Sequence, residues 1–321
     1  MESNGMFRKA QVFWSELGSL ESIGFQVSGM TCNRPSNCLM THTLALPIET
    51  IFHPSDFSAS SEVAFAHALK MALSCRAKLR ILHVKTDDQT SWQDFPGVRE
   101  TLARWGTISP DAASHDLSHL GLEVRKVVSG GENPVSTCIQ YLEKHPADLI
   151  VLAVHHHEGL AGWFHRPVGE PIAQKSGLMT LFLPHGVEGF ISRQTGAVNL
   201  NRILIPVTHK PRPQASIDAA VQWIQYLQIP AGTVTLLHVG EAADAPSIRI
   251  PTGTGWNWET VILPGDPADQ ILEVSRKKKA DLIIMTTDGP NGFLDALRGS
   301  TSHRVLQRSH CPILNLPVGV L

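Results

Sequence analysis

The sequence predicts an α/β protein made of two similar domains in tandem, each an open parallel five-stranded sheet with helices on both faces. Two observations lead to this fold class. Short, continuous apolar runs recur along the 321 residues, which is typical of strands buried on both faces of a parallel sheet. The same runs occur in the same order in both halves of the chain, and such a repeat indicates a duplicated domain.

Four pairs of segments carry the repeat. The first pair consists of apolar runs that end at a proline, TIFHPSD at 50–56 and RILIPVT at 202–208. The other pairs are 79–84 with 234–239, 147–151 with 280–284, and 178–184 with 311–317. Since these runs do not alternate apolar and polar residues, we assign them to strands that are buried on both faces.

Helical patterns separate the strands. Ser60 or Ser61 is expected to cap a helix in the first half, and the matching helix of the second half is expected to begin near Gln214. The apolar residues that recur at helical spacing are Val63, Ala66, Leu69 and Leu73 in the first helix, and Ile217, Val221, Ile224 and Leu227 in the second. Strands that alternate with helices form right-handed βαβ units, and such sheets bind ligands at the carboxyl ends of their strands.

The two halves differ in one connection. Residues 84–131 have helical character around 98–105, whereas 239–265 form a shorter connection with the composition of a loop. We therefore expect the second half to lack one helix.

The repeat also predicts the domain boundaries. Residues 1–45 match neither half, so we expect a leader that is disordered or reflects a misplaced start codon; a docking segment is the alternative. The two domains are expected at 46–186 and 200–321. Three glycines indicate that the stretch between them, 185–200, is a linker with a small hairpin at 194–196.

The composition narrows the possible partners and the compartment. The 27 basic and 29 acidic residues nearly balance, which argues against nucleic acid or an anionic membrane as the partner. The five cysteines form no CxxC pair, and an odd number favours free thiols in a reducing compartment. No apolar run is long enough to span a bilayer and no secretory pattern is present, so we expect a cytoplasmic protein.

A glycine-rich segment follows the fourth strand of the second half. It contains Gly289 and Gly299, ten residues apart, and continues with Ser300 and Thr301. It resembles the signature of the universal stress protein family, in which a glycine, two residues, a second glycine, nine residues and a third glycine precede Ser or Thr. Thr286 stands in place of the first glycine, and Gly292 is a further glycine of the loop.

The segment has a physical interpretation that does not depend on the family. Glycines let backbone amides approach a phosphate and adopt positive φ, while a helix beginning at Ser300 or Thr301 directs free N–H groups at the same anion. No GxxxxGK[ST] loop occurs in the chain, so this is not a P-loop. The alternative is a glycine turn that only connects a strand to a helix. By the family resemblance, Thr208 and Val239 lie at the nucleoside end of the second-half site.

The first half departs from the family pattern at the phosphate end. His156 replaces the first glycine, Gly159 and Gly169 hold the other two, and Glu170 replaces the Ser or Thr. A carboxylate at the start of a helix repels a polyphosphate, so we expect poor nucleotide binding there. The nucleoside end is better preserved, because Asp56 and Val84 match the family positions that face the nucleoside.

Two further groups of residues suggest other chemistry. A cluster of histidines is a candidate transition-metal site, with solvated loop histidines as the simpler interpretation; its members are His155, His156, His157 and His165. It is not a zinc HExxH motif, since Ala161 stands where the second histidine is needed. Trp256 and Trp258 could stack on an adenine ring, but packing against the sheet is the favoured interpretation.

The resemblance covers residues 46–320 and implies an adenine-nucleotide α-hydrolase-like, Rossmann-like fold in which the halves form a pseudo-dimer. It implies an adenine-nucleotide-binding stress-response protein that acts through conformation or an unidentified protein partner, with one ATP, ADP or AMP per chain in the second half. Mg²⁺ and a further homodimer are compatible additions. Two alternatives are kept, a slow ATP hydrolase and a scaffold that binds another ligand or none. Asp288 is the one carboxylate evident beside the second loop, so hydrolysis is at most weak.

Overall fold

The computed structural model describes residues 47–85, 95–111, 119–154, 168–253, 255–288 and 301–318. The expected leader lies outside these ranges, as do the histidine cluster and most of both glycine loops. The outcomes below concern the described part of the chain.

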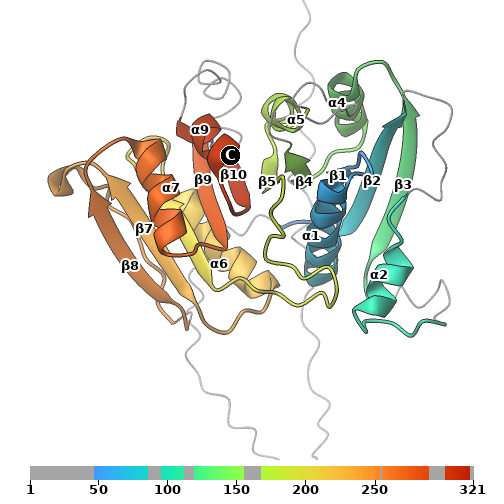
Figure 1. The fold of residues 1–321 in the computed structure, drawn as a ribbon, viewed down its shortest axis with the longest axis horizontal. Helices are drawn as coiled ribbons and strands as arrows, with labels where there is room; N and C mark the ends of the chain where they lie inside the picture. The colour runs from blue at the N-terminus through green and yellow to red at the C-terminus, as the bar shows by residue number, and fades with distance from the viewer. Residues whose placement is uncertain are drawn as a thin grey trace, which may run out of the picture. The chain divides into compact units, whose positions relative to one another are not determined.

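Strands and helices alternate through both halves (Figure 1). The elements of the first half are β1 (Thr50–Pro54), α1 (Ala59–Cys75), β2 (Lys78–Lys85), α2 (Val98–Arg104), β3 (Glu123–Gly130), α4 (Pro134–Lys144), β4 (Leu149–Val154), α5 (Gly169–Ser176) and β5 (Met179–Pro184). Those of the second half are β6 (Arg202–Pro206), α6 (Gln214–Tyr226), β7 (Thr233–Val239), the short 3-10 helix η2 (Ala242–Asp244), β8 (Asn257–Leu263), α7 (Pro267–Lys277), β9 (Leu282–Asp288), α9 (Thr301–Arg308) and β10 (Ile313–Val318).

The strands form one sheet in the order β3-β2-β1-β4-β5-β10-β9-β6-β7-β8. Each half contributes five parallel strands in the same relative order, as the sequence predicts. The continuity of the sheet was not predicted: β5 and β10 pair antiparallel and join the halves (Figure 1).

The register at this junction is symmetric. Leu181 pairs with Leu314, which is its counterpart in the repeat, and the neighbouring pairs are Phe182 with Ile313 and Thr180 with Asn315. A pseudo-twofold axis therefore passes through the pair of leucines, and the two halves meet as the subunits of an isologous dimer would.

One aspartate in each half fixes the start of the first strand. Asp148 Oδ2 accepts hydrogen bonds from the backbone N–H groups of Glu49 and Thr50, at 2.9 and 2.8 Å. Asp281 Oδ2 accepts the equivalent pair from Asn201 and Arg202, both at 2.8 Å. This explains why an Ala-Asp pair precedes the fourth strand in both halves.

The helix starts follow local rules, with one correction. Asn133 caps α4 and Asp266 caps α7, and each is followed by a proline at the first helical position. The prediction that Ser60 or Ser61 caps α1 was wrong, because Ser58 caps it by accepting from Ser61 N at 3.1 Å. Ser60 and Ser61 lie inside the helix and turn their hydroxyls to His185 and Ser55.

The sheet separates two apolar cores. One core packs against α1, α2 and α6, and includes Leu69, Leu102 and Trp223. The other packs against α4, α5, α7 and α9, and includes Ile172 and Ile271. Each core contains residues of both halves, so the halves share their interior as well as their sheet.

The connection between β7 and β8 contains no α-helix in its described residues, as the sequence predicts. Apart from Thr254, which is not described, its only helical residues are the three of η2. The corresponding connection of the first half includes α2, so the predicted difference between the halves is present in the described residues.

The stretch between the halves is packed rather than loose. Its predicted hairpin is present, with a β-bridge from Ile191 to Val198. His67 Nε2 on α1 accepts the backbone N–H groups of Phe190 and Ile191 at 3.1 and 3.2 Å. Trp105, which follows α2, donates from Nε1 to the carbonyl of Arg193 at 3.0 Å. The residue that directly follows α2, the helix without a counterpart in the second half, therefore helps to hold this hairpin.

The described cysteines are free thiols, namely Cys75, Cys138 and Cys311. Burial raises the pKa of each thiol to about 12, so all three are protonated and poorly nucleophilic at neutral pH. Cys32 and Cys38 lie outside the described residues.

Candidate functional site

Three predicted site residues of the second half, two from the nucleoside end and Thr286 from the start of the glycine loop, lie at one edge of the sheet. Thr208 follows β6, Val239 ends β7, and Thr286 lies near the end of β9. These three strands are neighbours in the order β9-β6-β7, so their carboxyl ends adjoin. This is the edge at which parallel α/β sheets bind ligands. Gly289, Gly292, Gly299 and Ser300 lie outside the described residues, and Thr301 is the first residue of α9.

A histidine next to the strand end organises this edge. His238 is 6% exposed, and its Nδ1 donates to the carbonyl of Val207 at 3.2 Å. Because a carbonyl can only accept, Nδ1 carries a proton, and in the neutral form of the ring Nε2 is an acceptor. Nε2 is buried and has no hydrogen-bond partner among the described residues. It lies beside Gly240, where an added Cβ would be 3.0 Å from it.

The first half repeats the bond but covers the ring. His83 Nδ1 donates to the carbonyl of Ser55 at 2.8 Å. Phe57 stacks on this imidazole with 4.0 Å between ring centroids and 13° between ring planes, and Phe95 packs edge-on against Phe57 at 5.1 Å. The second half has His209 at the position that corresponds to Phe57. Two aromatic rings thus occupy space at the strand ends of the first half.

The other predicted residues of the first half have structural partners. Asp56 Oδ1 accepts from the backbone N–H of Ser58 at 3.0 Å and from its hydroxyl at 2.7 Å, which orders the turn before α1. Val84 is buried in the core. Gly169 starts α5 beside Leu152, whose Cδ1 would be 2.6 Å from an added Cβ. Gly159 is not described.

Glu170 bonds across the junction between the halves. Its side chain is 5% exposed, and Oε2 accepts from His303 Nδ1 at 2.9 Å. His303 lies in the first turn of α9, two residues after Thr301. The sequence placed Glu170 at the start of a helix, as observed, but it did not reveal this partner from the other half.

The first turn of α9 is also held by α7. Arg304 donates to Asp266 at 2.8 Å and to Asp269 at 3.2 Å, and Arg308 donates to Asp269 at 2.8 Å. The hydrogen bond from Arg304 lowers the pKa of Asp266, with a further contribution from the backbone N–H of Asp269. Three residues thus fix the orientation of α9, His303 toward the first half and the two arginines toward α7.

The two tryptophans of the short connection differ in exposure. Trp256 is 6% exposed and donates from Nε1 to the carbonyl of Ile229 at 3.2 Å, so it is part of the core. Trp258 lies in β8 and is half-buried against the same core. Packing is therefore the role that the structure shows for both side chains.

Neither the predicted metal site nor a membrane span appears in the described residues. His155, His156, His157 and His165 lie outside them. Within the described ranges, no three His, Cys, Asp or Glu side chains are grouped as metal ligands. No described helix is both long enough and apolar enough to cross a bilayer.

Comparison with known proteins decides the family. A family model described as the universal stress protein family matches residues 47–184 and 249–317. The chain belongs to this family. The resemblance inferred from the glycine loops is thus confirmed, and each matched segment lies in a different half of the chain.

Individual members of the universal stress protein family match shorter segments. Universal stress protein MJ0531 of Methanocaldococcus jannaschii is 49% identical over 104 residues, which are 32% of this chain and 56% of that protein. Universal stress protein YxiE of Bacillus subtilis is 39% identical over 56 residues, which are 17% of this chain and 38% of that protein. The chain therefore matches about half or less of these relatives' lengths.

Solved structures agree with the fold. A universal stress protein from Archaeoglobus fulgidus superposes with a TM-score of 0.55 at 18% identity, covering 84% of this chain and 96% of that one. A universal stress protein from Pseudomonas aeruginosa gives a TM-score of 0.51 at 13% identity, covering 84% and 93%. At these identities the likeness establishes the architecture alone.

Proposed function

We propose that the second half binds one adenine nucleotide per chain at the carboxyl ends of β6, β7 and β9. The observation that carries this proposal is the difference between the two strand-end histidines. Nε2 of His238 is a buried acceptor beside Gly240, without a partner among the described residues, whereas Phe57 stacks on the ring of His83. A buried polar atom without a partner is costly, and a ligand that donates a hydrogen bond to it removes that cost.

The residues of the second half fit a nucleoside at this edge. An amino or hydroxyl group of the nucleoside would donate to His238, the Thr208 hydroxyl would donate or accept, and the backbone at Val239 and Gly240 would line the base or sugar. Thr208 is exposed and follows directly on the residue whose carbonyl His238 binds. Thr286 would complete this end from β9.

The loop between β9 and α9 would hold the phosphates. We propose this role for Gly289, Gly292, Gly299, Ser300 and Thr301, with free N–H groups at the start of α9 contributing to the binding. Arg304 and His303 hold α9 in place through α7 and Glu170, so the helix start would be fixed before the nucleotide arrives. A preorganised site loses less entropy on binding than a mobile one.

The first half would serve a structural role. Asp56, Val84, Gly159 and Gly169 are its matching positions, but Asp56 already bonds to Ser58, Val84 is core, and Phe57 and Phe95 lie at the strand ends. We propose three parts for the chain, a leader at 1–45 and domains at 46–186 and 200–321. In this cytoplasmic stress-response protein, the nucleotide would act by changing how the chain engages a protein partner.

Isothermal titration with ATP, ADP and AMP, with and without Mg²⁺, tests the proposal. We expect a stoichiometry of one, loss of at least about 100-fold in affinity for Gly299→Asp, and about tenfold for Ser300→Ala, since each removes a phosphate contact. Gly130→Asp is the control in the first half, because an added Cβ at this exposed glycine meets nothing within 4 Å, and it should leave nucleotide affinity unchanged. A stoichiometry of two, or full affinity in Gly299→Asp, would place the site elsewhere.

A further inference from the structure

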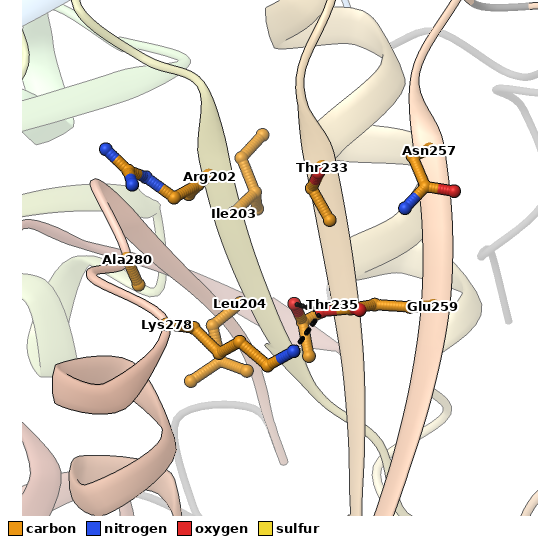
Figure 2. Close-up of a pocket in the computed structure, with 9 residues that line it drawn as sticks. All are labelled: Arg202, Ile203, Leu204, Thr233, Thr235, Asn257, Glu259, Lys278 and Ala280. Carbon is orange, nitrogen blue, oxygen red and sulfur yellow. Dashed lines mark hydrogen bonds and ion pairs between the residues drawn. The ribbon is translucent and has the colours of Figure 1, made fainter.

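A recess lies at the amino ends of β6, β7 and β8 (Figure 2). Its volume is about 220 Å³, and its lining residues are Arg202, Ile203, Leu204, Thr233, Thr235, Asn257, Glu259, Lys278 and Ala280. Arg202, Thr233 and Asn257 are the first residues of β6, β7 and β8, so the recess is at the amino ends of these strands. The proposed nucleotide site is at the opposite ends of β6 and β7, beside β9.

Strand register explains how the polar groups converge. Arg202 pairs with Thr233, and Thr233 pairs with Asn257, so one row of side chains crosses three strands. Paired residues of a parallel sheet point to the same face, which is why these three share the recess. Figure 2 shows Arg202 and Asn257 at opposite sides of it, with Thr233 between them.

A second row, two residues further along, forms the other side. It consists of Leu204, Thr235 and Glu259. Glu259 accepts from the Thr235 hydroxyl at 2.7 Å and from Lys278 Nζ at 2.9 Å (Figure 2). The hydrogen bond from Lys278 lowers the pKa of Glu259, with the Thr235 bond next, so the carboxylate is ionised and its charge is compensated within the recess.

Larger residues stand at the corresponding positions of the first half. The counterparts of Thr233 and Thr235 are Lys78 and Arg80, and the counterpart of Leu204 is Phe52. Phe52 stacks on Tyr141 of α4, with 5.7 Å between ring centroids. The residues that line the recess therefore differ between the halves in both size and charge.

The Arg202 guanidinium is the group of the recess that is best able to take an anion. Lys278 already pairs with Glu259 at 2.9 Å. The partner of Arg202 among the described residues is weaker, because its Nε is 3.9 Å from Asp281 Oδ2, an oxygen that already accepts two backbone N–H groups. The guanidinium side chain is half-exposed, and its terminal nitrogens remain able to take a second acceptor.

We propose that this recess is a binding site for a small hydroxycarboxylate. The carboxylate would form a two-pronged pair with the Arg202 guanidinium, and the ligand hydroxyl would bond to Thr233 and to the Asn257 amide. The volume corresponds to about seven water molecules in the liquid, which matches a ligand with about seven non-hydrogen atoms. One weakly paired cation beside two carboxylates, Asp281 and Glu259, suits a monoanion better than a dianionic phosphate.

Ligand-observed NMR and isothermal titration with glycerate, which matches this size and chemistry, test the proposal on the full chain. We expect one site per chain, and a roughly tenfold or greater loss of affinity in Arg202→Gln and in Thr233→Val. Thr233→Val keeps the shape of the side chain and removes only the hydroxyl. Arg125→Gln is the matched control, because it removes one exposed positive charge from the corresponding rows of the first half and should change nothing.

Three comparison probes define the chemistry. Acetate lacks the hydroxyl and glycerol lacks the charge, so both should bind at least about tenfold more weakly than glycerate. The proposal is overturned if glycerate fails to bind at about 10 mM, if inorganic phosphate binds more tightly, or if Arg202→Gln binds as well as the natural chain. Gly299→Asp should retain glycerate, so this site can be judged independently of the proposed nucleotide site.

Discussion

The two halves share a strand order, the aspartates that anchor their first strands and the caps of α4 and α7, yet they differ at both edges of the sheet. At the carboxyl edge, the first half covers its histidine with Phe57, whereas the second half has Gly240 beside His238. At the amino edge, Lys78 and Arg80 are replaced by two threonines. The two halves thus share the residues that hold the strands and differ in those at the strand ends.

The halves also differ in the polarity of their interior. The first half buries His53 and His67, whose counterparts in the second half are Ile205 and Ala219. His53 Nδ1 donates to the carbonyl of Val151 at 2.8 Å, and His67 links α1 to the hairpin between the halves. The polar interior of the first half fixes the hairpin, but it makes that half sensitive to acid.

Acidification is predicted to have the largest effect and to act on the first half. Burial lowers the pKa of His53 and of His67 from 6.5 to about 4, so both stay neutral in the folded chain while the unfolded chain binds protons below 6.5. Their contribution is complete above pH 6.5 and is lost as the pH falls toward 4. At pH 5 the loss is about 2 kcal/mol for each histidine.

Denaturant unfolding between pH 7 and 5, with hydrogen exchange followed by peptide, measures this loss. As the pH falls, the amides of β1 and β4 should lose protection from hydrogen exchange at a higher pH than the amides of β6 and β9. His53→Ile copies the second half and should remove about half of the pH dependence. Equal loss in both halves would show that other groups control the acid response.

Replacing His67 is predicted to have the next largest effect. His67→Val removes the imidazole and leaves the amides of Phe190 and Ile191 without their acceptor, so it should lower the free energy of unfolding by about 3 kcal/mol at pH 7. His53→Ile is the control. His53→Ile removes one hydrogen bond, from Nδ1 to the carbonyl of Val151, but leaves no backbone amide unpaired, so it should cost about 1 kcal/mol. Urea unfolding compares the two, and similar costs would contradict the role given to the hairpin.

Glu170→Gln tests the link between the halves. The amide oxygen still accepts from His303, but the charge is lost, so we expect a cost of about 1 kcal/mol in denaturant unfolding. The substitution alone should not create a nucleotide site in the first half, because Phe57 and Phe95 still occupy the strand ends. A titration stoichiometry that rises from one to two would show that Glu170 was the barrier.

Sequence reasoning reached the fold because the apolar runs and their order are local properties that repeat. It also matched the segments 79–84 and 234–239, but it did not reveal the bond from the histidine in each segment to the carbonyl after the first strand. That bond depends on the register between strands that are far apart in sequence. The same holds for Glu170 with His303 and for the row Arg202, Thr233 and Asn257, which exist only once the strands are in order.

The smallest predicted effect concerns the caps of the equivalent helices α4 and α7. Asn133 accepts from Ser136 N at 3.2 Å, while Asp266 accepts from Asp269 N at 3.0 Å. Asn133→Asp exchanges one cap for the other and adds a charge favourable to the helix dipole, so it should change stability by less than about 0.5 kcal/mol. Asn133→Ala removes the acceptor and should cost about 1 kcal/mol in urea unfolding. If both variants lower the free energy of unfolding by the same amount, the hydrogen bond of the cap does not contribute to stability. Asn133 would then act through its conformation in the preceding turn, and the two caps would be similar in geometry but not in their contribution to stability.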